Sequence, residues 1–157
     1  MKTVVIFGGS GFVGQHIIRR IAKNGYKIII PHQQQANEAK LKLLGTMGQI
    51  YPIRFRSINE PIIINQIEKA DVVLNLKTLW NEKEITYEKS ILDFNIKLID
   101  TLNKNNKNVQ FIYFSGIGID KHTDSKRSKA IFKSEKYIQK NLKNSMIIRP
   151  GIIIGGG

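Results

Sequence analysis

Glycines at regular spacing near the amino terminus are the first candidates for ligand chemistry. They occupy positions 8, 11 and 14, directly after a short apolar run. Glycine at 8 permits a sharp turn, at 11 it lets the backbone approach a pyrophosphate, and at 14 it lets a following helix lie close to a sheet. The free N–H groups of that helix favour an anion. We therefore predict dinucleotide binding, with an unliganded turn as the alternative, by Gly8, Gly9, Ser10, Gly11, Phe12, Val13 and Gly14.

The end of the next apolar run is the second candidate, because a dinucleotide site normally selects its ribose there. An acid about 20 residues beyond the glycines favours NAD, whereas an arginine accommodates the 2′-phosphate of NADP. The chain has Pro31, His32 and Gln33 at this place, no arginine, and its next acid is Glu38. We take His32 and Gln33 as candidate ribose or phosphate contacts, with exposed loop residues as the alternative. The choice between NAD and NADP stays open.

The elements that must position these residues alternate between short apolar runs and segments of helical period. This alternation predicts an α/β fold, a doubly wound parallel sheet of about six strands with helices on both faces, which is the NAD(P)-binding Rossmann fold. Pro52 argues against a central position for the third strand. We expect strands at 3–7, 27–30, 49–55, 71–76, 109–114 and 146–148, and helices at 12–23, 36–44, 59–69, 84–103 and 126–142, in one domain over residues 1–157.

Composition narrows the class of protein. The chain has no cysteine and three scattered histidines, which excludes a disulfide scaffold and a thiol nucleophile and predicts no metal site. The formal net charge of +13 fits either a lysine-rich solvated surface or an anion-binding one. We expect no nucleic-acid partner, because no stacking platform or recognition motif accompanies the charge. No apolar run approaches the roughly 20 residues that span a bilayer, so we expect a cytoplasmic protein without a transmembrane segment.

Several stretches together resemble the short-chain dehydrogenase/reductase superfamily, in its extended branch of NAD-dependent epimerase/dehydratase type. Within that branch the chain is most similar to the Rossmann-type accessory subunit of respiratory complex I and its bacterial relatives. The resemblance implies cofactor contacts from Asn75, Leu76 and Lys129, and places Lys77 where the family often has glycine, adding bulk and charge near the cofactor. The stretches are Gly8–Gly14, Gly48–Ile50, Ala70–Leu76, Phe111–Ser115, Ser128–Ala130 and Arg149–Gly155.

The catalytic pair of that superfamily is incomplete in this chain. The resemblance implies a Tyr-x-x-x-Lys pair, in which the phenol exchanges a proton and the lysine lowers its pKa. No tyrosine of the chain has a lysine four residues later, and Lys129 is preceded at that spacing by Ser125. A serine hydroxyl is far too weak an acid to replace a phenol of pKa about 10. We keep Lys129, Ser115 and Ser125 as candidates, with a strand-end turn as the alternative role for Ser115.

Three functions follow from these observations, of which the last, a basic binder of nucleic acid or of a membrane surface, is supported only by charge. The first is an NAD(P)-binding protein without turnover, with a structural or assembly role like that of the complex I subunit, peripheral to a respiratory membrane. The second is an active NAD(P)-dependent oxidoreductase, epimerase or dehydratase that uses a substitute proton donor. Extended-branch relatives carry a further C-terminal substrate-binding portion, and we expect it to be missing here, in a minimal domain or a truncated product. The apolar end at Ile152–Ile154 is then a candidate surface for a protein partner.

Overall fold

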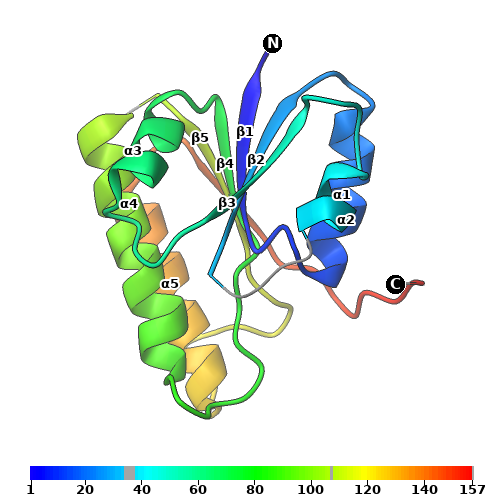
Figure 1. The fold of residues 1–157 in the computed structure, drawn as a ribbon. Helices are drawn as coiled ribbons and strands as arrows, with labels where there is room; N and C mark the ends of the chain where they lie inside the picture. Colours follow the sequence, from blue (N-terminus) through cyan, green and yellow to red (C-terminus); the bar gives the residue numbers. More distant parts are fainter. Residues whose placement is uncertain (34–37, 107, 157) are drawn as a thin grey trace.

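Six parallel strands form one sheet in the order β3-β2-β1-β4-β5-β6 (Figure 1). The computed structural model describes residues 1–33, 38–106 and 108–156. The chain moves outward from β1 to β3, returns to β4 beside β1, and continues to β6, which is the doubly wound order expected from the sequence. The strands are β1 (Thr3–Phe7), β2 (Lys27–His32), β3 (Ile50–Arg54), β4 (Val72–Asn75), β5 (Gln110–Phe114) and β6 (Ser145–Ile148).

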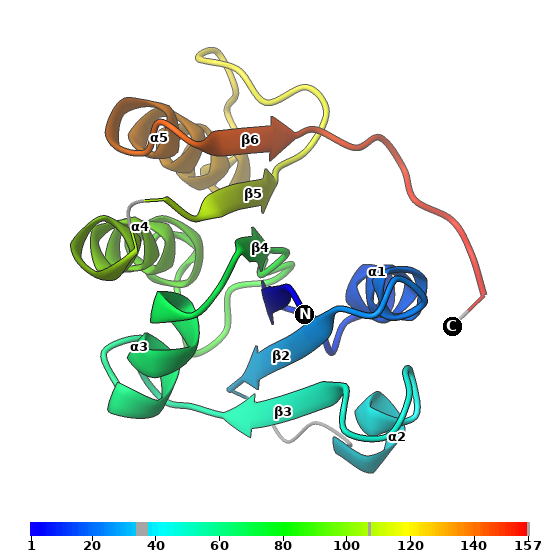
Figure 2. The same ribbon diagram turned by 90° about the horizontal axis from the view of Figure 1, so that it is seen from above.

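Helices cover both faces of this sheet (Figure 2). Two of them pack on one face, α1 (Phe12–Ala22) and α2 (Glu38–Lys42). The opposite face carries α3 (Pro61–Glu68), α4 (Phe94–Asn105) and α5 (Lys126–Asn141). Parallel strands covered on both sides are expected to be apolar along their whole length, and Ile28, Ile29 and Ile30 of β2 are all buried. The predicted fold class is therefore confirmed.

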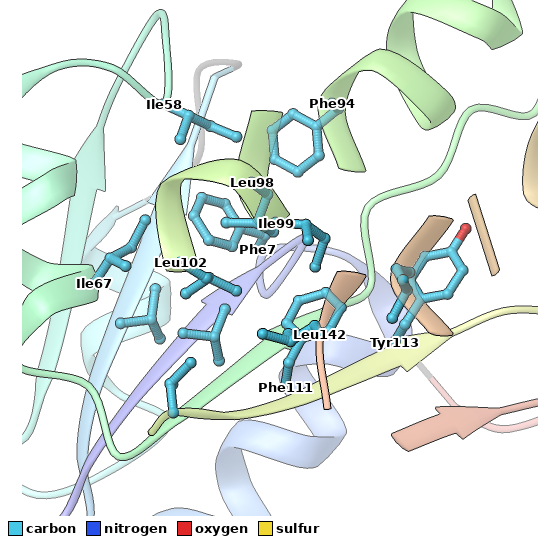
Figure 3. Packing of buried hydrophobic residues seen from close by; sticks show 14 of the residues in the cluster. Phe7, Ile58, Ile67, Phe94, Leu98, Ile99, Leu102, Phe111, Tyr113 and Leu142 are labelled. Atoms are coloured by element: carbon cyan, nitrogen blue, oxygen red, sulfur yellow. The ribbon is translucent and has the colours of Figure 1, made fainter. Parts of the chain in front are cut away.

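The core is divided by the sheet into two apolar clusters. The larger lies under α3, α4 and α5, where the Phe7 ring meets the edges of Phe55 and Phe94 at centroid distances of 5.8 Å and 5.5 Å. Figure 3 shows this packing, with Phe7 between the residues of α4 and the strands. The smaller cluster joins the other sheet face to α1 and α2 through Ile18 and Leu41. β1 and β4 therefore have both faces covered, which fixes the position of the loops that follow them.

Most predicted boundaries lie within two residues of the observed ones, and three differences stand out. The helix expected from residue 84 begins as a π-helical turn, η1 (Glu88–Asp93), that runs into α4. Residues before it form a turn instead, in which the Tyr87 N–H donates to Glu82 Oε1 (2.8 Å) and the Tyr87 hydroxyl donates to the Trp80 carbonyl (2.9 Å). The helix expected over 36–44 includes residues 36 and 37, which lie outside the described residues, and α2 covers Glu38–Lys42.

The third difference concerns the cap of α3. The helix expected over 59–69 begins at Pro61, with Glu60 as its N-cap residue. The Glu60 carboxylate turns back and accepts hydrogen bonds from the N–H groups of Arg56 (2.7 Å) and Ser57 (2.8 Å). These backbone donors lower the pKa of Glu60. Pro52 stands in β3, which is an edge strand, as its missing N–H predicts.

Candidate functional site

The glycine turn joins β1 to α1 with no room for side chains at two of its positions. Gly8 has φ of +78°, and a Cβ there would lie 2.8 Å from the Leu76 carbonyl carbon and from the Lys77 nitrogen. A Cβ on Gly14 would lie 2.6 Å from the Cα and carbonyl oxygen of Gly9. At Gly14 the helix therefore packs against the turn itself. Gly9 fits between β1, β2 and α1, where a Cβ would meet the Ile30 side chain at 3.0 Å.

Gly11 differs from these glycines because the protein leaves space beside it. It is the N-cap residue of α1, with extended backbone at φ −75° and ψ 172° and no side chain to cap the helix. A Cβ there would make one ordinary contact, 3.4 Å from the Gly8 carbonyl oxygen. The first N–H groups of an α-helix have no partner within the helix and carry its positive dipole end. This cradle fits the pyrophosphate of a dinucleotide.

A cleft of about 570 Å³ opens at this turn, at the carboxyl ends of the strands. Ligands bind at that edge of a doubly wound sheet, at the point where the order of the strands reverses, which here lies between β1 and β4. The predicted residues that line the cleft are Gly8, Gly11, Phe12, Val13, Gly14, Leu76 and Ser115. Further lining residues follow β4, β5 and β6 or begin α5, among them Thr78, Trp80, Tyr113, Ile117, Arg127, Ile131 and Pro150–Ile153.

Ser115 lines this cleft and carries an unpaired polar atom. Its Oγ is buried and has no hydrogen-bond partner among the described residues, while its N–H donates to the Ile148 carbonyl across to β6 (2.8 Å). A buried hydroxyl without a partner costs about 1–3 kcal/mol, so a ligand that bonds it would recover that cost. The orphaned hydroxyl and the open glycine cradle in one cleft both fit a nucleotide cofactor.

The other two catalytic candidates lie elsewhere. Ser125 is the N-cap of α5, and its Oγ accepts a hydrogen bond from the Ser128 N–H (3.4 Å). Ser125 and Lys129 are both exposed, and neither is among the residues that line the cleft. Between them, Arg127 turns the other way and does line it. The four-residue spacing therefore marks the solvent side of this helix end.

Asn75 and Lys77 both bond to the π-helical turn and its continuation. Asn75 is fully buried, donates from Nδ2 to Asn95 Oδ1 (2.8 Å) and accepts the Lys77 N–H at Oδ1 (3.0 Å). Lys77 Nζ donates to the carbonyl and hydroxyl oxygens of Ser90 (3.1 and 3.2 Å) and lies 4.4 Å from the Phe94 ring centroid. Burial lowers the pKa of Lys77 to about 8. Its charge therefore does not face the cofactor cleft, contrary to expectation.

His32 and Gln33, the candidates at the end of β2, also stand outside the cleft lining. His32 is buried, with Nε2 at 3.0 Å from Glu38 Oε1, so the first acid after β2 binds this histidine. Gln33 Nε2 donates to the Arg56 carbonyl (3.3 Å). The sheet places Arg54 of β3 opposite His32 in register. The search for an arginine at the end of β2 therefore missed Arg54, which stands beside that position on β3.

Arg127, Trp80 and Tyr113 are cleft residues that sequence reasoning missed. Arg127 donates from Nε to the Leu79 carbonyl (2.9 Å) and from Nη2 to Thr78 Oγ1 (3.0 Å), and its Cζ lies 4.3 Å from the Trp80 ring centroid. Burial raises the pKa of Tyr113 to about 12, so this phenol stays protonated. Their shared signal is position, because loops after parallel strands meet at one sheet edge.

The C-terminal segment leaves β6 and runs toward the side of α1 (Figure 2), and its residues Pro150–Ile153 line the cleft. Arg149 is tied to α5 through the buried Glu135 carboxylate, to which its Nε donates at 2.9 Å. The Pro150 carbonyl accepts from the Ile117 N–H (3.1 Å), and His16 Nε2 lies 2.9 Å from the Gly156 carbonyl oxygen. Ile152 and Ile154 remain 92% and 89% exposed. The segment thus forms one wall of the cleft and leaves an apolar outer edge.

Membrane-spanning helices and metal-binding groups were both predicted to be absent, and both can be sought among the described residues. In that part of the chain no helix is long and apolar enough to cross a membrane. Among those residues, no group of three or more His, Cys, Asp or Glu is placed to hold a metal ion.

Comparison with known proteins agrees with this architecture. The family model described as "NAD dependent epimerase/dehydratase family" matches residues 4–137. Similar curated proteins include "NADH dehydrogenase [ubiquinone] 1 alpha subcomplex subunit 9, mitochondrial" of Dictyostelium discoideum, 30% identical over 96% of this chain and 42% of that protein. The protein of the same name in Arabidopsis thaliana is 26% identical over 96% of this chain and 38% of its own length. The chain thus spans about two fifths of these relatives.

A solved structure supports the fold independently. An NAD-dependent epimerase/dehydratase from Bacillus halodurans superposes with a TM-score of 0.75, at 17% identity, over 96% of this chain and 71% of that one. At this identity the likeness concerns the fold. Together, the matches confirm the resemblance that the glycine turn and the Arg-Pro stretch indicated.

Proposed function

This chain belongs to the NAD dependent epimerase/dehydratase family, and from that premise we propose that it binds NAD or NADP without turnover and serves a structural or assembly role in a respiratory complex. The observation that carries the proposal is the cleft, which is lined by the open Gly11 cradle and by Ser115, whose buried hydroxyl has no partner among the described residues. Family membership implies a nicotinamide dinucleotide. We propose that residues 1–157 act as one dinucleotide-binding domain.

The residues divide the binding task by position. In this proposal the N–H groups at the start of α1 hold the pyrophosphate, since Gly11 leaves the approach open. Leu76 and Val13 supply apolar contact, and Ser115 Oγ donates to or accepts from a polar group of the ligand. When bound, the nicotinamide ring supplies reversible hydride transfer. His32, at the end of β2, and the following Gln33 lie outside the cleft lining, and in this proposal an adenosine ribose would have to extend beyond that lining to reach them.

Absence of turnover is supported by the proton-transfer groups. Reduction of a carbonyl needs a proton for the developing alkoxide, and a positioned general acid contributes about 10²–10⁴-fold. Ser125 caps α5 and Lys129 is exposed, so a water held between them would not stand in the cleft. Tyr113 does line the cleft, but burial raises its pKa to about 12, and the residue four positions after it is Ile117 rather than a lysine. The active oxidoreductase, epimerase or dehydratase is therefore the less supported alternative.

The respiratory role is supported by the named relatives, which are subunits of NADH dehydrogenase from mitochondria. We propose that this chain likewise associates with a respiratory complex, peripheral to its membrane. The exposed Ile152 and Ile154 offer an apolar contact that a monomer in water leaves uncovered. They lie beside the cleft wall, so a partner bound there would also close the cofactor site.

Titration with NADH and NADPH tests the proposal. The single tryptophan, Trp80, lines the cleft, so energy transfer from it to a bound nicotinamide should accompany enhanced nicotinamide fluorescence. We expect saturable binding of at least one dinucleotide and no oxidation of it by a panel of aldehydes and ketones. Failure of both nucleotides to bind would refute the binding function, and carbonyl-dependent oxidation would favour the enzyme.

A further inference from the structure

Arg127 is held in a fixed position within a largely apolar cleft. Its Nε and Nη2 are bonded to the Leu79 carbonyl and Thr78 Oγ1, and its guanidinium plane is stacked on Trp80. These contacts belong to the loop after β4, so they also set the position of that loop against α5. A guanidinium has five N–H donors, and two of the five are used in these bonds. The donors that remain are available to a ligand in the cleft.

The charge of Arg127 is not balanced by the protein. Among the described residues that line the cleft, Arg127 carries the sole formal charge. No ion pair joins it to a carboxylate in the described part of the chain, since the nearby Glu135 is bound to Arg149. The surrounding lining is apolar, including Ile117, Ile131 and Ile152. A guanidinium in such surroundings attracts an anion strongly, because little water competes for it.

We propose that this end of the cleft binds a second ligand beside the dinucleotide, an apolar molecule with one carboxylate, which pairs with Arg127. The proposal extends the proposed function and rests on it in one respect, that the dinucleotide occupies the glycine turn. Arginine matches a planar carboxylate with parallel N–H donors. The apolar walls from β5, α5 and the C-terminal segment would cover the body of the ligand. Thr78 and Trp80 act as positioning residues for the guanidinium.

The alternative source of the anion is the dinucleotide itself. Its pyrophosphate is expected at the start of α1, on the β1 side of the cleft, whereas Arg127 begins α5 and reaches the loop after β4. Burial raises the pKa of Tyr113 of β5, and the nearby Arg127 guanidinium acts against that rise, which again places the guanidinium at the β5 side. The structure therefore separates the glycine cradle from the cation, and two anionic groups have separate partners.

Octanoate and octanamide form a matched pair of probes for this pairing. Both have the same apolar chain, and they differ in the charge of the head group. Trp80 fluorescence reports binding directly, because it is the single tryptophan and stacks on Arg127. We expect octanoate to bind the full chain about tenfold to a hundredfold more tightly than octanamide, which is the range for hydrogen bonds to a charged group. Equal affinity of the two probes in the wild-type chain would overturn the proposal.

Variants identify the residue responsible. Arg127→Gln should reduce octanoate affinity to that of octanamide, and Arg127→Lys should retain part of the preference. Lys126→Gln removes the same charge from the adjacent exposed position and should leave the preference unchanged. Circular dichroism melts of each variant establish that it is folded, and the comparison of probes in the wild-type chain needs no variant at all.

NADH titration separates this inference from the proposed function. We expect Arg127→Gln to bind NADH within about twofold of wild type. A tenfold or greater loss of NADH affinity would mean that Arg127 pairs with the dinucleotide phosphates, and would overturn the second site. If octanoate discrimination is present but NADH does not bind, the proposed function fails while the Arg127 site stands. If NADH binds and discrimination is absent, the reverse holds.

Discussion

Gly11 shows at the scale of one residue that ligand access and local folding make separate demands. Its neighbours tolerate a Cβ at 3.4 Å, and its extended backbone is that of an ordinary N-cap. Aspartate is among the best N-cap residues, whereas its charge would repel a pyrophosphate. The absence of a side chain at Gly11 is therefore explained by the proposed pyrophosphate and not by crowding within the protein.

We predict that Gly11→Asp raises the free energy of unfolding by a few tenths of a kcal/mol while lowering NADH affinity at least tenfold. Urea unfolding and NADH fluorescence measure the two effects. Gly11→Asn is the matched control, since it caps equally well without charge and should bind NADH more tightly than the aspartate variant. Wild-type affinity in Gly11→Asp would show that the pyrophosphate does not lie on this turn.

Lys77 provides a pH-dependent test at the same scale. Burial lowers its pKa from 10.5 to about 8 in the folded protein. Between these values the unfolded chain holds the proton and the folded chain releases it, so this residue favours unfolding as pH falls from about 10.5 to about 8. Below pH 8 both states are protonated and the contribution is constant.

We predict that Lys77→Met removes this pH dependence. The free energy of unfolding of the wild type minus that of the variant should rise between pH 8 and pH 10, and stay level between pH 6 and pH 7. Urea titrations at each pH provide both values, and the subtraction removes the titration of other lysines and tyrosines. A difference that is constant across the whole range would contradict the lowered pKa.

At the scale of elements, the junction of α1 with the glycine turn is tighter than its contact with the sheet. A Cβ on Gly14 would meet three backbone atoms of Gly8 and Gly9 at 2.6–2.7 Å, and backbone atoms cannot rotate away. We predict that Gly14→Ala destabilises the protein by about 1–3 kcal/mol through overpacking. Gly11→Ala, with its ordinary contact, is the control and should cost less than 1 kcal/mol, about the loss of an N-cap glycine. Similar urea midpoints for the two variants would refute this difference.

The ion pair between Glu135 of α5 and Arg149 after β6 connects the last helix to the cleft wall. Glu135 is 1% exposed, so removal of its partner leaves a buried carboxylate uncompensated. We predict that Arg149→Met costs about 1–3 kcal/mol, and that Glu135→Gln combined with Arg149→Met recovers part of it. Thermal melts of the single and double variants measure the coupling. A double variant less stable than Arg149→Met alone would contradict the prediction.

At the scale of the whole molecule, the proposed function assigns cofactor binding and catalysis to different parts of the chain. In that proposal binding uses the β1–α1 turn and the β5 end, whereas the resemblance to the wider superfamily implies proton transfer from a residue at the place of Ser125. We predict no hydride transfer to simple carbonyls by the wild type, and none by Ser125→Tyr, which also costs about 1 kcal/mol through loss of the α5 cap. Stopped NADH assays would reveal either activity. NADH oxidation by the wild type that is lost in Lys129→Ala would contradict the prediction and establish that the protein is an enzyme.

The order of the elements, and the burial of the strands on both sides, were determined by local sequence. Apolar runs such as Ile28–Ile30 can be buried on both sides in a parallel sheet, and Pro52 excludes β3 from its centre. The glycine turn was equally predictable, because positive φ at Gly8 and close approach at Gly14 depend on residues next to each other in the chain. These features follow from short-range sterics.

The part of the cleft that the sequence did not predict was decided by tertiary structure. Arg127 and Trp80 are 47 residues apart in the chain, yet they stack because α5 packs beside the loop after β4. Lys77 binds Ser90 and His32 binds Glu38 because buried polar groups need partners that only packing supplies. Ser125 and Lys129 keep the spacing of a catalytic pair but face solvent. Spacing along a helix determines which residues share a face, and packing determines which way that face points.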